Sequence, residues 1–197
     1  MAGPPYTTKE LSSRTWEDFE RLFRKPGEWS SCQCMWFHRP GPRPREEVEG
    51  LSSKERNEKN FQVQRDLVKM GRSHGILVYL GDDPIGWCQY GAREEFPRID
   101  NAPRYRGIPP AQGGTRLWRV TCFCVDKQHR KQGVARAGLH AAMDSIRRGG
   151  GGVVEAYPTT RKEGLALHRG TPSMFEREGF EVVARLGASN LTVRRTT

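Results

Sequence analysis

The chain has 197 residues, 35% of them hydrophobic and 28% charged, which suits one folded domain able to bury a substantial core. Its formal net charge of +10 is compatible with anionic cofactors, acidic partners or nucleic acid. No zinc-finger, recognition-helix or aromatic ribonucleoprotein pattern accompanies the basic residues, so we do not expect nucleic-acid binding. The sequence has no apolar run of about 18 residues and no signal-peptide pattern at its start. We therefore expect a cytoplasmic protein without a membrane partner.

The first 70 residues contain two helical patterns and a segment rich in aromatic residues and cysteine. Residues 7–12 are predicted to form a strand, and residues 15–24 an amphipathic helix capped by Thr15. The side chains expected to face inward are Trp16, Phe19, Leu22 and Phe23. The aromatic segment at 28–39 leads into a proline-rich stretch. A charged helical pattern then runs from about residue 46 to residue 70, with a break near residues 50–53.

Residues 75–90 read as two strands joined by a Gly-Asp-Asp-Pro turn, which is a hairpin signal. Residues 94–116 follow as an insertion rich in proline and glycine. It is too long for a plain turn, and loops of that length are often binding loops or disordered.

The most informative segment is 122–136. Residues 120–125 are β-branched, aromatic and cysteine-rich, as in a buried strand, whereas Val134, Leu139 and Ile146 recur at helical spacing. The spacing of apolar residues thus changes from that of a strand to that of a helix at Gly133. The free N–H groups at the start of a helix bind phosphate well, and Arg130 and Lys131 add positive charge there.

The pattern Arg130-x-x-Gly133-x-Ala135 resembles the Gln/Arg-x-x-Gly-x-Gly/Ala signature of the GNAT superfamily of N-acetyltransferases. In that family the signature loop holds the pyrophosphate of acetyl-CoA. The hairpin at 75–90 is similar to the one that precedes the family's cofactor strand. The resemblance implies an α/β (α+β) fold, with a central mixed, mostly antiparallel sheet flanked by helices and strands splayed around the cofactor.

The downstream elements agree with this resemblance. Residues 152–158 read as the next strand, and residues 171–180 give a capping Thr171, a helix-starting Pro172 and a Gly-Phe ending. A closing hairpin follows over residues 181–194. We expect one domain over residues 1–197, with residues 1–70 forming the acceptor side and residues 71–197 the cofactor-binding core.

The resemblance also implies a set of cofactor contacts. The pantetheine arm would pair with the backbone of the cofactor strand, and the pyrophosphate would lie on the signature loop. The residues concerned are Phe123, Cys124, Val125, Arg130, Lys131, Gln132, Gly133, Val134, Ala135 and Arg136.

The chemistry implied is direct attack of a primary amine on the thioester, for which a base and an acid are needed. Glu94 and Glu95 follow the third predicted strand and are the base candidates, although solvated residues at a loop start have the same pattern. Asp126 and Glu155 are weaker candidates, since a turn start and a solvent-facing strand position explain them equally well.

The acid is less well defined. Many family members have a Tyr four residues before the terminal Gly, where this chain has Phe175. Tyr157, Ser173, a cysteine near the strand or water could replace it. For Tyr157, at a strand end before Pro158, packing is the favoured explanation, and helix capping is the alternative explanation for Ser173.

The acceptor side is expected to use the aromatic segment, the third strand and the insertion. Its candidate substrate-binding residues are Trp29, Trp36, Phe37, Trp87 and Tyr90. Four of them, Trp29, Trp36, Phe37 and Tyr90, could form an aromatic wall for a flat or cationic amine. Core packing is the alternative explanation for each of them.

The cysteines raise the question of a metal. Cys32, Cys34 and His38, with Cys122 and Cys124, are residues of the type that zinc prefers. The single residue inside each cysteine pair differs from the usual spacing of structural zinc sites. Cysteine in an apolar strand is typically a small buried hydrophobe. We therefore expect no metal, and no covalent acyl-cysteine intermediate.

Taken together, the sequence predicts an acetyl-CoA-dependent N-acetyltransferase that acts on a primary amine of a small molecule. A protein or peptide amine as acceptor, and a noncatalytic acyl-CoA-binding or regulatory domain, are the alternatives. The oligomeric state is left open, with a homodimer as one option.

Overall fold

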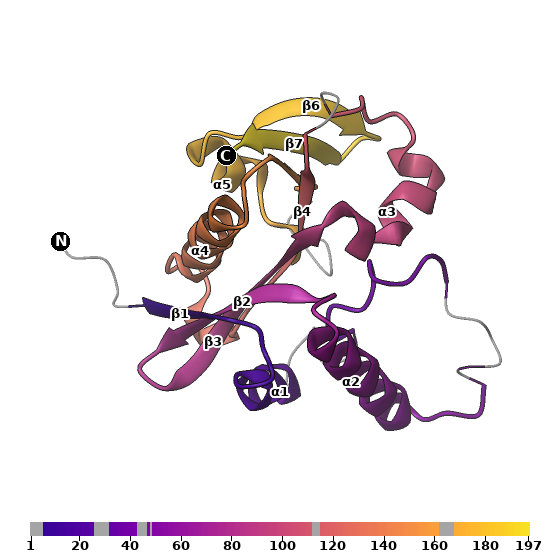
Figure 1. Ribbon diagram of the computed structural model, residues 1–197, viewed down its shortest axis with the longest axis vertical. Helices are drawn as coiled ribbons and strands as arrows, with labels where there is room; N and C mark the ends of the chain where they lie inside the picture. The colour runs from indigo at the N-terminus through magenta and orange to yellow at the C-terminus, as the bar shows by residue number, and fades with distance from the viewer. Residues whose placement is uncertain (1–5, 26–31, 43–46, 48, 112–114, 162–167) are drawn as a thin grey trace.

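A seven-stranded sheet forms the centre of the molecule, in the order β1-β2-β3-β4-β5-β7-β6 (Figure 1). The computed structural model describes the chain except residues 1–5, 26–31, 43–46, 48, 112–114 and 162–167. The strands are β1 (Tyr6–Glu10), β2 (His74–Leu80), β3 (Asp83–Ala92), β4 (Leu117–Val125), β5 (Val153–Ala156), β6 (Glu181–Leu186) and β7 (Asn190–Thr196). Only the β4–β5 pair is parallel among these strands. The predicted fold class, a mixed and mostly antiparallel sheet with flanking helices, is confirmed.

Helices lie on both faces of this sheet. They are α1 (Trp16–Arg24), α2 (Ser53–Lys69), α3 (Pro97–Asn101), α4 (Val134–Arg148) and α5 (Pro172–Arg177). One buried cluster joins α4 and α5 to the sheet, and a second joins α1 and α2 to the opposite face. Alternation along β2 explains the division, because Ile76 and Val78 enter the first cluster while Leu77 and Tyr79 enter the second.

The N-terminal helices follow the apolar pattern of their sequence. All four predicted inward side chains of α1 are buried. Thr15 does not cap α1 with its side chain, because its Oγ1 donates to the Glu10 carbonyl instead. The second helix begins only at Ser53, where Ser52 and Glu55 form a reciprocal capping box. The predicted break near residues 50–53 agrees with this start, and the predicted helical stretch before it lies partly outside the described residues.

The insertion after β3 is folded over most of its length. It contains α3 between two short 3-10 turns, Arg93–Glu95 and Pro103–Tyr105. Its apolar side chains form a third buried cluster with residues from either side of it: Phe37, Phe96, Ile99, Tyr105 and Tyr157. Among the helices of the described residues, none is long and apolar enough to cross a membrane.

Candidate active site

The loop between β4 and α4 has the geometry of an anion-binding turn. The Asp126 carboxylate accepts the Gln128 N–H at 3.1 Å and starts a 3-10 turn over Lys127–His129. Gly133 then adopts φ 91°, in the left-handed region where a residue without Cβ is favoured. A Cβ built on Gly133 would meet no atom within 4 Å, so the space in front of the loop is open.

Several backbone donors face this open space. The Ala137 N–H donates to the Gly133 carbonyl at 2.9 Å, which is the first hydrogen bond of α4. Within the described part of the chain, the N–H groups of residues 132–136 have no protein acceptor. These donors and the positive end of the helix dipole together suit a phosphate group.

The polar and charged side chains around the loop differ in whether they are already bound to other protein groups. Lys131 and Gln132 are exposed, and the Arg130 Nε–H donates to the Val125 carbonyl at 3.4 Å. The Arg136 Nε lies 2.7 Å from a carboxylate oxygen of Glu178, so this predicted cofactor contact is already paired. Lys131 therefore offers the more available positive charge.

The strands β4 and β5 diverge next to this loop. They pair only from Leu117 with Val153 to Val120 with Ala156. Beyond that point β4 continues to pair with β3. The chain after β5 instead stays beside β7, where the Leu191 N–H donates to the Pro158 carbonyl at 3.0 Å. Among the described strands, none pairs with this edge of β4 over residues 121–125, directly before the anion-binding turn.

This edge suits the amide-bearing arm of a CoA molecule. Exposed strand edges bind extended ligands through backbone hydrogen bonds. The structure thus brings together the predicted cofactor residues of β4 with those of the signature loop. One edge acceptor is already used, because the Phe123 carbonyl accepts His168 Nδ1–H at 3.0 Å. No sequence pattern indicated this contact.

A bulge in β4 lies where the divergence starts. Gln89 of β3 pairs with Cys122 and Tyr90 with Val120, so Thr121 is an extra residue on β4. Bulges of this kind redirect side chains and backbone groups, and they are common beside active sites. This bulge could not be located from the sequence alone.

A buried hydrogen-bond chain runs from the bulge across the face that α1 covers. The Gln89 side chain is fully buried, and its Oε1 accepts a hydrogen bond from the Thr121 hydroxyl at 2.8 Å. Its Nε2 donates to the Cys34 carbonyl at 2.9 Å and to His38 Nε2 at 3.0 Å. The His38 Nδ1–H donates to the Glu95 carbonyl at 2.8 Å. Burial lowers the pKa of His38 to about 4, so its ring is neutral at pH 7.

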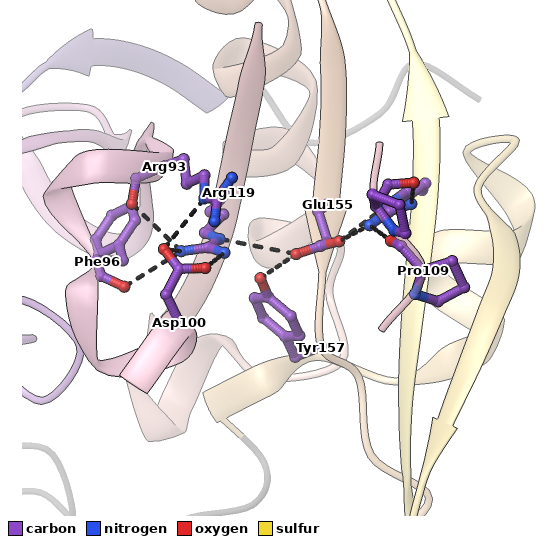
Figure 2. Close-up of polar contacts among 9 residues, drawn as sticks. Arg93, Phe96, Asp100, Pro109, Arg119, Glu155 and Tyr157 are labelled. Carbon is purple, nitrogen blue, oxygen red and sulfur yellow. Dashed lines mark hydrogen bonds and ion pairs between the residues drawn. The ribbon is translucent and has the colours of Figure 1, made fainter. Parts of the chain in front are cut away.

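A second buried network fixes the insertion to the sheet (Figure 2). Arg119 and Glu155, on neighbouring strands, are 3% and 1% exposed, and their closest charged atoms are 3.7 Å apart. The Arg119 guanidinium also reaches Asp100 of α3 at 2.6 Å, and Arg194 of β7 lies 2.7 Å from Glu155. The solvent-facing position that was one explanation of Glu155 does not apply, because its carboxylate is buried against these cations.

The two predicted acid candidates lie in different environments. Tyr157 is buried and its hydroxyl donates to Glu155, and burial raises the pKa of Tyr157 well above its ordinary value. Ser173 is exposed in the first turn of α5. Thr171, rather than Ser173, caps this helix by accepting the Met174 N–H at 3.3 Å.

The two base candidates also differ. The Glu95 carboxylate accepts the Ala92 N–H at 3.0 Å and lies 2.9 Å from His74 Nδ1. The hydrogen bond to Glu95 raises the pKa of His74. Glu94 is exposed, and within the described residues its carboxylate has no hydrogen bond or ion pair.

The predicted aromatic wall is not formed by its described members. Trp87 is buried in the cluster with α1, whereas Tyr90 is buried in the cluster with α4 on the opposite face of the sheet. The alternation of side chains along β3 separates them. These two substrate-binding candidates therefore cannot contact the same ligand from one face of the sheet.

The aromatic residues before α2 occupy a third location. Phe37 packs in the cluster of the insertion, and Trp36 is 46% exposed with the Arg98 guanidinium 3.8 Å from its ring. Trp29 lies outside the described residues. Phe37 and Trp36 therefore stay candidates for acceptor contacts at the edge of the insertion.

Phe175 occupies the place where a tyrosine would be the candidate acid. It is fully buried between Phe123 and Phe180, with ring centroids 6.0 and 5.1 Å away. Its role is packing between α5 and β4, and no proton donor stands at this position.

The open strand edge and the anion-binding turn agree with the relationship of the sequence to known proteins. Residues 10–169 match the acetyltransferase (GNAT) family. The chain belongs to this family. No curated protein sequence matches this GNAT chain.

Solved structures with the same fold have low sequence identity to this GNAT protein. A putative GNAT acetyltransferase from Desulfovibrio desulfuricans is 15% identical, with a TM-score of 0.53 and coverage of 97% of this chain and 98% of the other. The PaiA N-acetyltransferase from Thermoplasma acidophilum, solved with coenzyme A, is 12% identical, with a TM-score of 0.54 and full coverage of both chains. The NatC complex bound to Gag peptide and CoA is 12% identical, with a TM-score of 0.51 and 98% coverage of each chain. These similarities establish a shared fold.

Proposed function

We propose that this GNAT protein transfers the acetyl group of acetyl-CoA to a primary amine of a small molecule. The observation that carries the proposal is the β4 edge at residues 121–125, which leads into a turn whose N–H groups at 132–136 have no acceptor among the described residues. A strand edge and a phosphate-binding turn in sequence match the two chemical parts of CoA, its amide arm and its pyrophosphate.

The transfer we propose is direct. The neutral amine attacks the thioester carbonyl, the new C–N bond forms, the C–S bond breaks, and the released thiolate takes up a proton. The backbone at the Thr121 bulge is our candidate for stabilising the developing oxyanion, because a bulge leaves backbone groups outside the regular ladder.

Proton transfer is assigned to the predicted groups that stay available. Glu94 and Ser173 are exposed, whereas Glu95 and Tyr157 are held in hydrogen bonds. We propose Glu94, through water, as the acceptor of the amine proton. Ser173 or water would return a proton to the thiolate.

The insertion supports a small acceptor rather than an extended peptide. It packs on the segment before α2, since Arg98 donates to the Gly41 carbonyl at 2.6 Å and Asn101 to the Pro40 carbonyl at 3.1 Å. Arg194 joins it to β7 through the Pro109 carbonyl at 2.6 Å. These contacts occupy acceptor-side surface that a peptide would need.

Calorimetric titration with acetyl-CoA and CoA tests cofactor binding first. Turnover is then measured by mass spectrometry of free CoA with two panels, small primary amines and short peptides. Mass spectrometry is preferred to a thiol reagent because the chain has five free cysteines. Micromolar binding with turnover of small amines supports the proposal. Turnover of peptides alone would refute the substrate class, and binding without any turnover would favour the noncatalytic alternative.

Variants of the proton-transfer candidates complete this test. Glu94→Gln should lower kcat with little change in acetyl-CoA affinity, whereas Glu95→Gln should act mainly on stability because it removes the cap of a turn. Equal activity of wild type and Glu94→Gln would remove Glu94 from the proposed mechanism.

A further inference from the structure

Three cysteine side chains from distant parts of the sequence meet on the α1 side of the sheet. The Sγ atoms of Cys34, Cys122 and Cys124 all lie within 4.8 Å of one another. The two cysteines on β4 have their sulfur atoms 4.0 Å apart. Cys32 and His38, which the sequence grouped with these residues, are not members of this cluster.

The surroundings hold Cys34 in an unusual backbone conformation. Gln33 and Cys34 have φ values of 45° and 57°, in the left-handed region that residues with a Cβ rarely adopt. The Gln89 amide donates to the Cys34 carbonyl at 2.9 Å, and the indole N–H of Trp87 donates to the Cys34 sulfur at 3.1 Å. Strained backbone of this kind persists where neighbouring contacts over-determine it, and it is frequent at functional sites.

The sulfur positions approach the geometry of a zinc site. With Zn–S bonds of about 2.3 Å, the edge of a tetrahedral site is about 3.8 Å long. The observed separations of 4.0 Å, and at most 4.8 Å, need side-chain adjustments of about 1 Å or less to reach it. Thiolates are soft ligands that select zinc over the hard cations magnesium and calcium.

We propose that Cys34, Cys122 and Cys124 bind one Zn²⁺ ion through their thiolates. His168 lies beside the site, with Nδ1 4.0 Å from the Cys124 sulfur, but this nitrogen donates to the Phe123 carbonyl and is not counted among the ligands. The Trp87 indole supports Cys34 from behind, as outer partners do at metal sites. The ion joins the segment before α2 to the cofactor strand and so fixes the acceptor side. This inference does not depend on the proposed transferase activity.

The sequence argument against a metal does not apply to this cluster, for a physical reason. It considered each cysteine pair by its own spacing, whereas the cluster uses one cysteine from the first pair and both from the second. Alternation places both β4 cysteines on one face of the strand, and the loop supplies the third ligand. The expectation of no metal is replaced by this proposal.

Metal content and cobalt substitution test the site. The full-length protein is purified under reducing conditions, analysed for zinc by mass spectrometry, stripped with a chelator and titrated with Zn²⁺ and Co²⁺. We expect one equivalent of metal per chain and thiolate-to-cobalt charge-transfer absorption. Cys34→Ala, Cys122→Ala and Cys124→Ala should each lose at least tenfold in zinc affinity. Cys88→Ala is the matched control, because Cys88 is a buried cysteine on β3, as Cys34 and Cys124 are buried, but belongs to the cluster on the other face.

The thermal stability of the wild-type protein provides a second measurement, which does not depend on whether the cysteine variants fold. Zinc should raise the Tm of the stripped wild-type protein, since a ligand that binds only the folded state stabilises it. Trp87→Phe, which removes the N–H donated to Cys34, should weaken zinc binding by about tenfold. The proposal is overturned if stripped, reduced wild-type protein binds neither ion, if Cys122→Ala binds zinc as tightly as wild type, or if copper replaces zinc in the purified protein.

Discussion

Gly133 shows how one residue can connect backbone conformation to cofactor binding. Its φ of 91° suits glycine, and the space beside it is open toward the free N–H groups of the turn. A Cβ added there would meet no protein atom within 4 Å, but it would enter the space that we propose for the phosphate. We therefore expect a substitution of Gly133 to weaken cofactor binding without disturbing the packing of the protein.

Replacing Gly133 by Ala should lower acetyl-CoA affinity by about tenfold, equivalent to about 1.4 kcal/mol. The matched control is Gly81→Ala in the β2–β3 turn, where φ is 59° and the space is also open. Both variants should lose about 1 kcal/mol of unfolding free energy from backbone strain. Calorimetry and urea unfolding measure the two effects separately. Equal loss of affinity in both variants, or no loss in either, would contradict the assignment of the turn.

His38 makes stability depend on pH at the residue scale. Its pKa is lowered from 6.5 to about 4 in the folded protein by burial, so the unfolded chain binds the extra proton between these values. The unfolding free energy should therefore fall as the pH falls below 6.5, by roughly 2 kcal/mol at pH 5. His38→Gln should lack this component in urea unfolding measured across pH 5 to 7.

His74 provides the opposite sign and serves as the comparison. Its folded pKa is raised, first of all by the hydrogen bond with Glu95, so its contribution to stability is full at acidic pH and is lost as the pH rises through that pKa. The stability difference between wild type and His74→Gln should grow as the pH falls, whereas that between wild type and His38→Gln should shrink. Parallel pH profiles for the two variants would contradict these assignments.

At the scale of elements, the sequence predicted those parts of the fold that depend on local periodicity. The inward face of α1, the hairpin of β2 and β3, and the change from β4 to α4 each follow from side-chain spacing and turn residues. The short helices of the insertion were not predicted, because packing against residues 37–41 and the sheet stabilises them rather than local propensity. The break predicted near residues 50–53 falls at the capping box of Ser52, where α2 begins.

The buried network of β4 and β5 connects these elements energetically. Glu155→Gln should remove the negative charge that Arg119 and Arg194 share. The two buried or half-buried cations would then lose one of the carboxylates that compensate their charge. We expect a loss of about 3 kcal/mol in unfolding free energy. Digestion by trypsin near Arg104 and Arg106 should also become faster, because the insertion loses its anchor.

The control for this variant is Glu181→Gln on β6, where the side chain is exposed. Its effect should stay within about 0.5 kcal/mol, as for surface positions in general. Urea unfolding and timed digestion measure the two consequences. Similar stability of both variants would show that the network carries little of the structural energy.

Across the whole molecule, the candidate site depends on pairings between distant segments. The signature loop was predicted because its residues are consecutive. Gln89 with His38, Arg119 with Glu155 and Cys34 with the β4 cysteines are long-range contacts that depend on sheet register and strand order. A single sequence does not specify register around a bulge such as that at Thr121, so these parts of the site required the structure.

The net charge of +10 also acts at the scale of the whole molecule, since it attracts an anionic cofactor before any contact forms. Lys131→Glu at the turn and Arg185→Glu on the far edge strand β6 change the net charge equally. At 0.1 M salt, the electrostatic attraction of an exposed charge is screened beyond about 10 Å. Lys131→Glu, at the turn, should therefore reduce the association rate of acetyl-CoA several-fold more than Arg185→Glu. Stopped-flow binding at low and high salt measures this difference, which should shrink as salt is added. If both variants slowed association equally, overall charge rather than the turn would direct the cofactor to this protein.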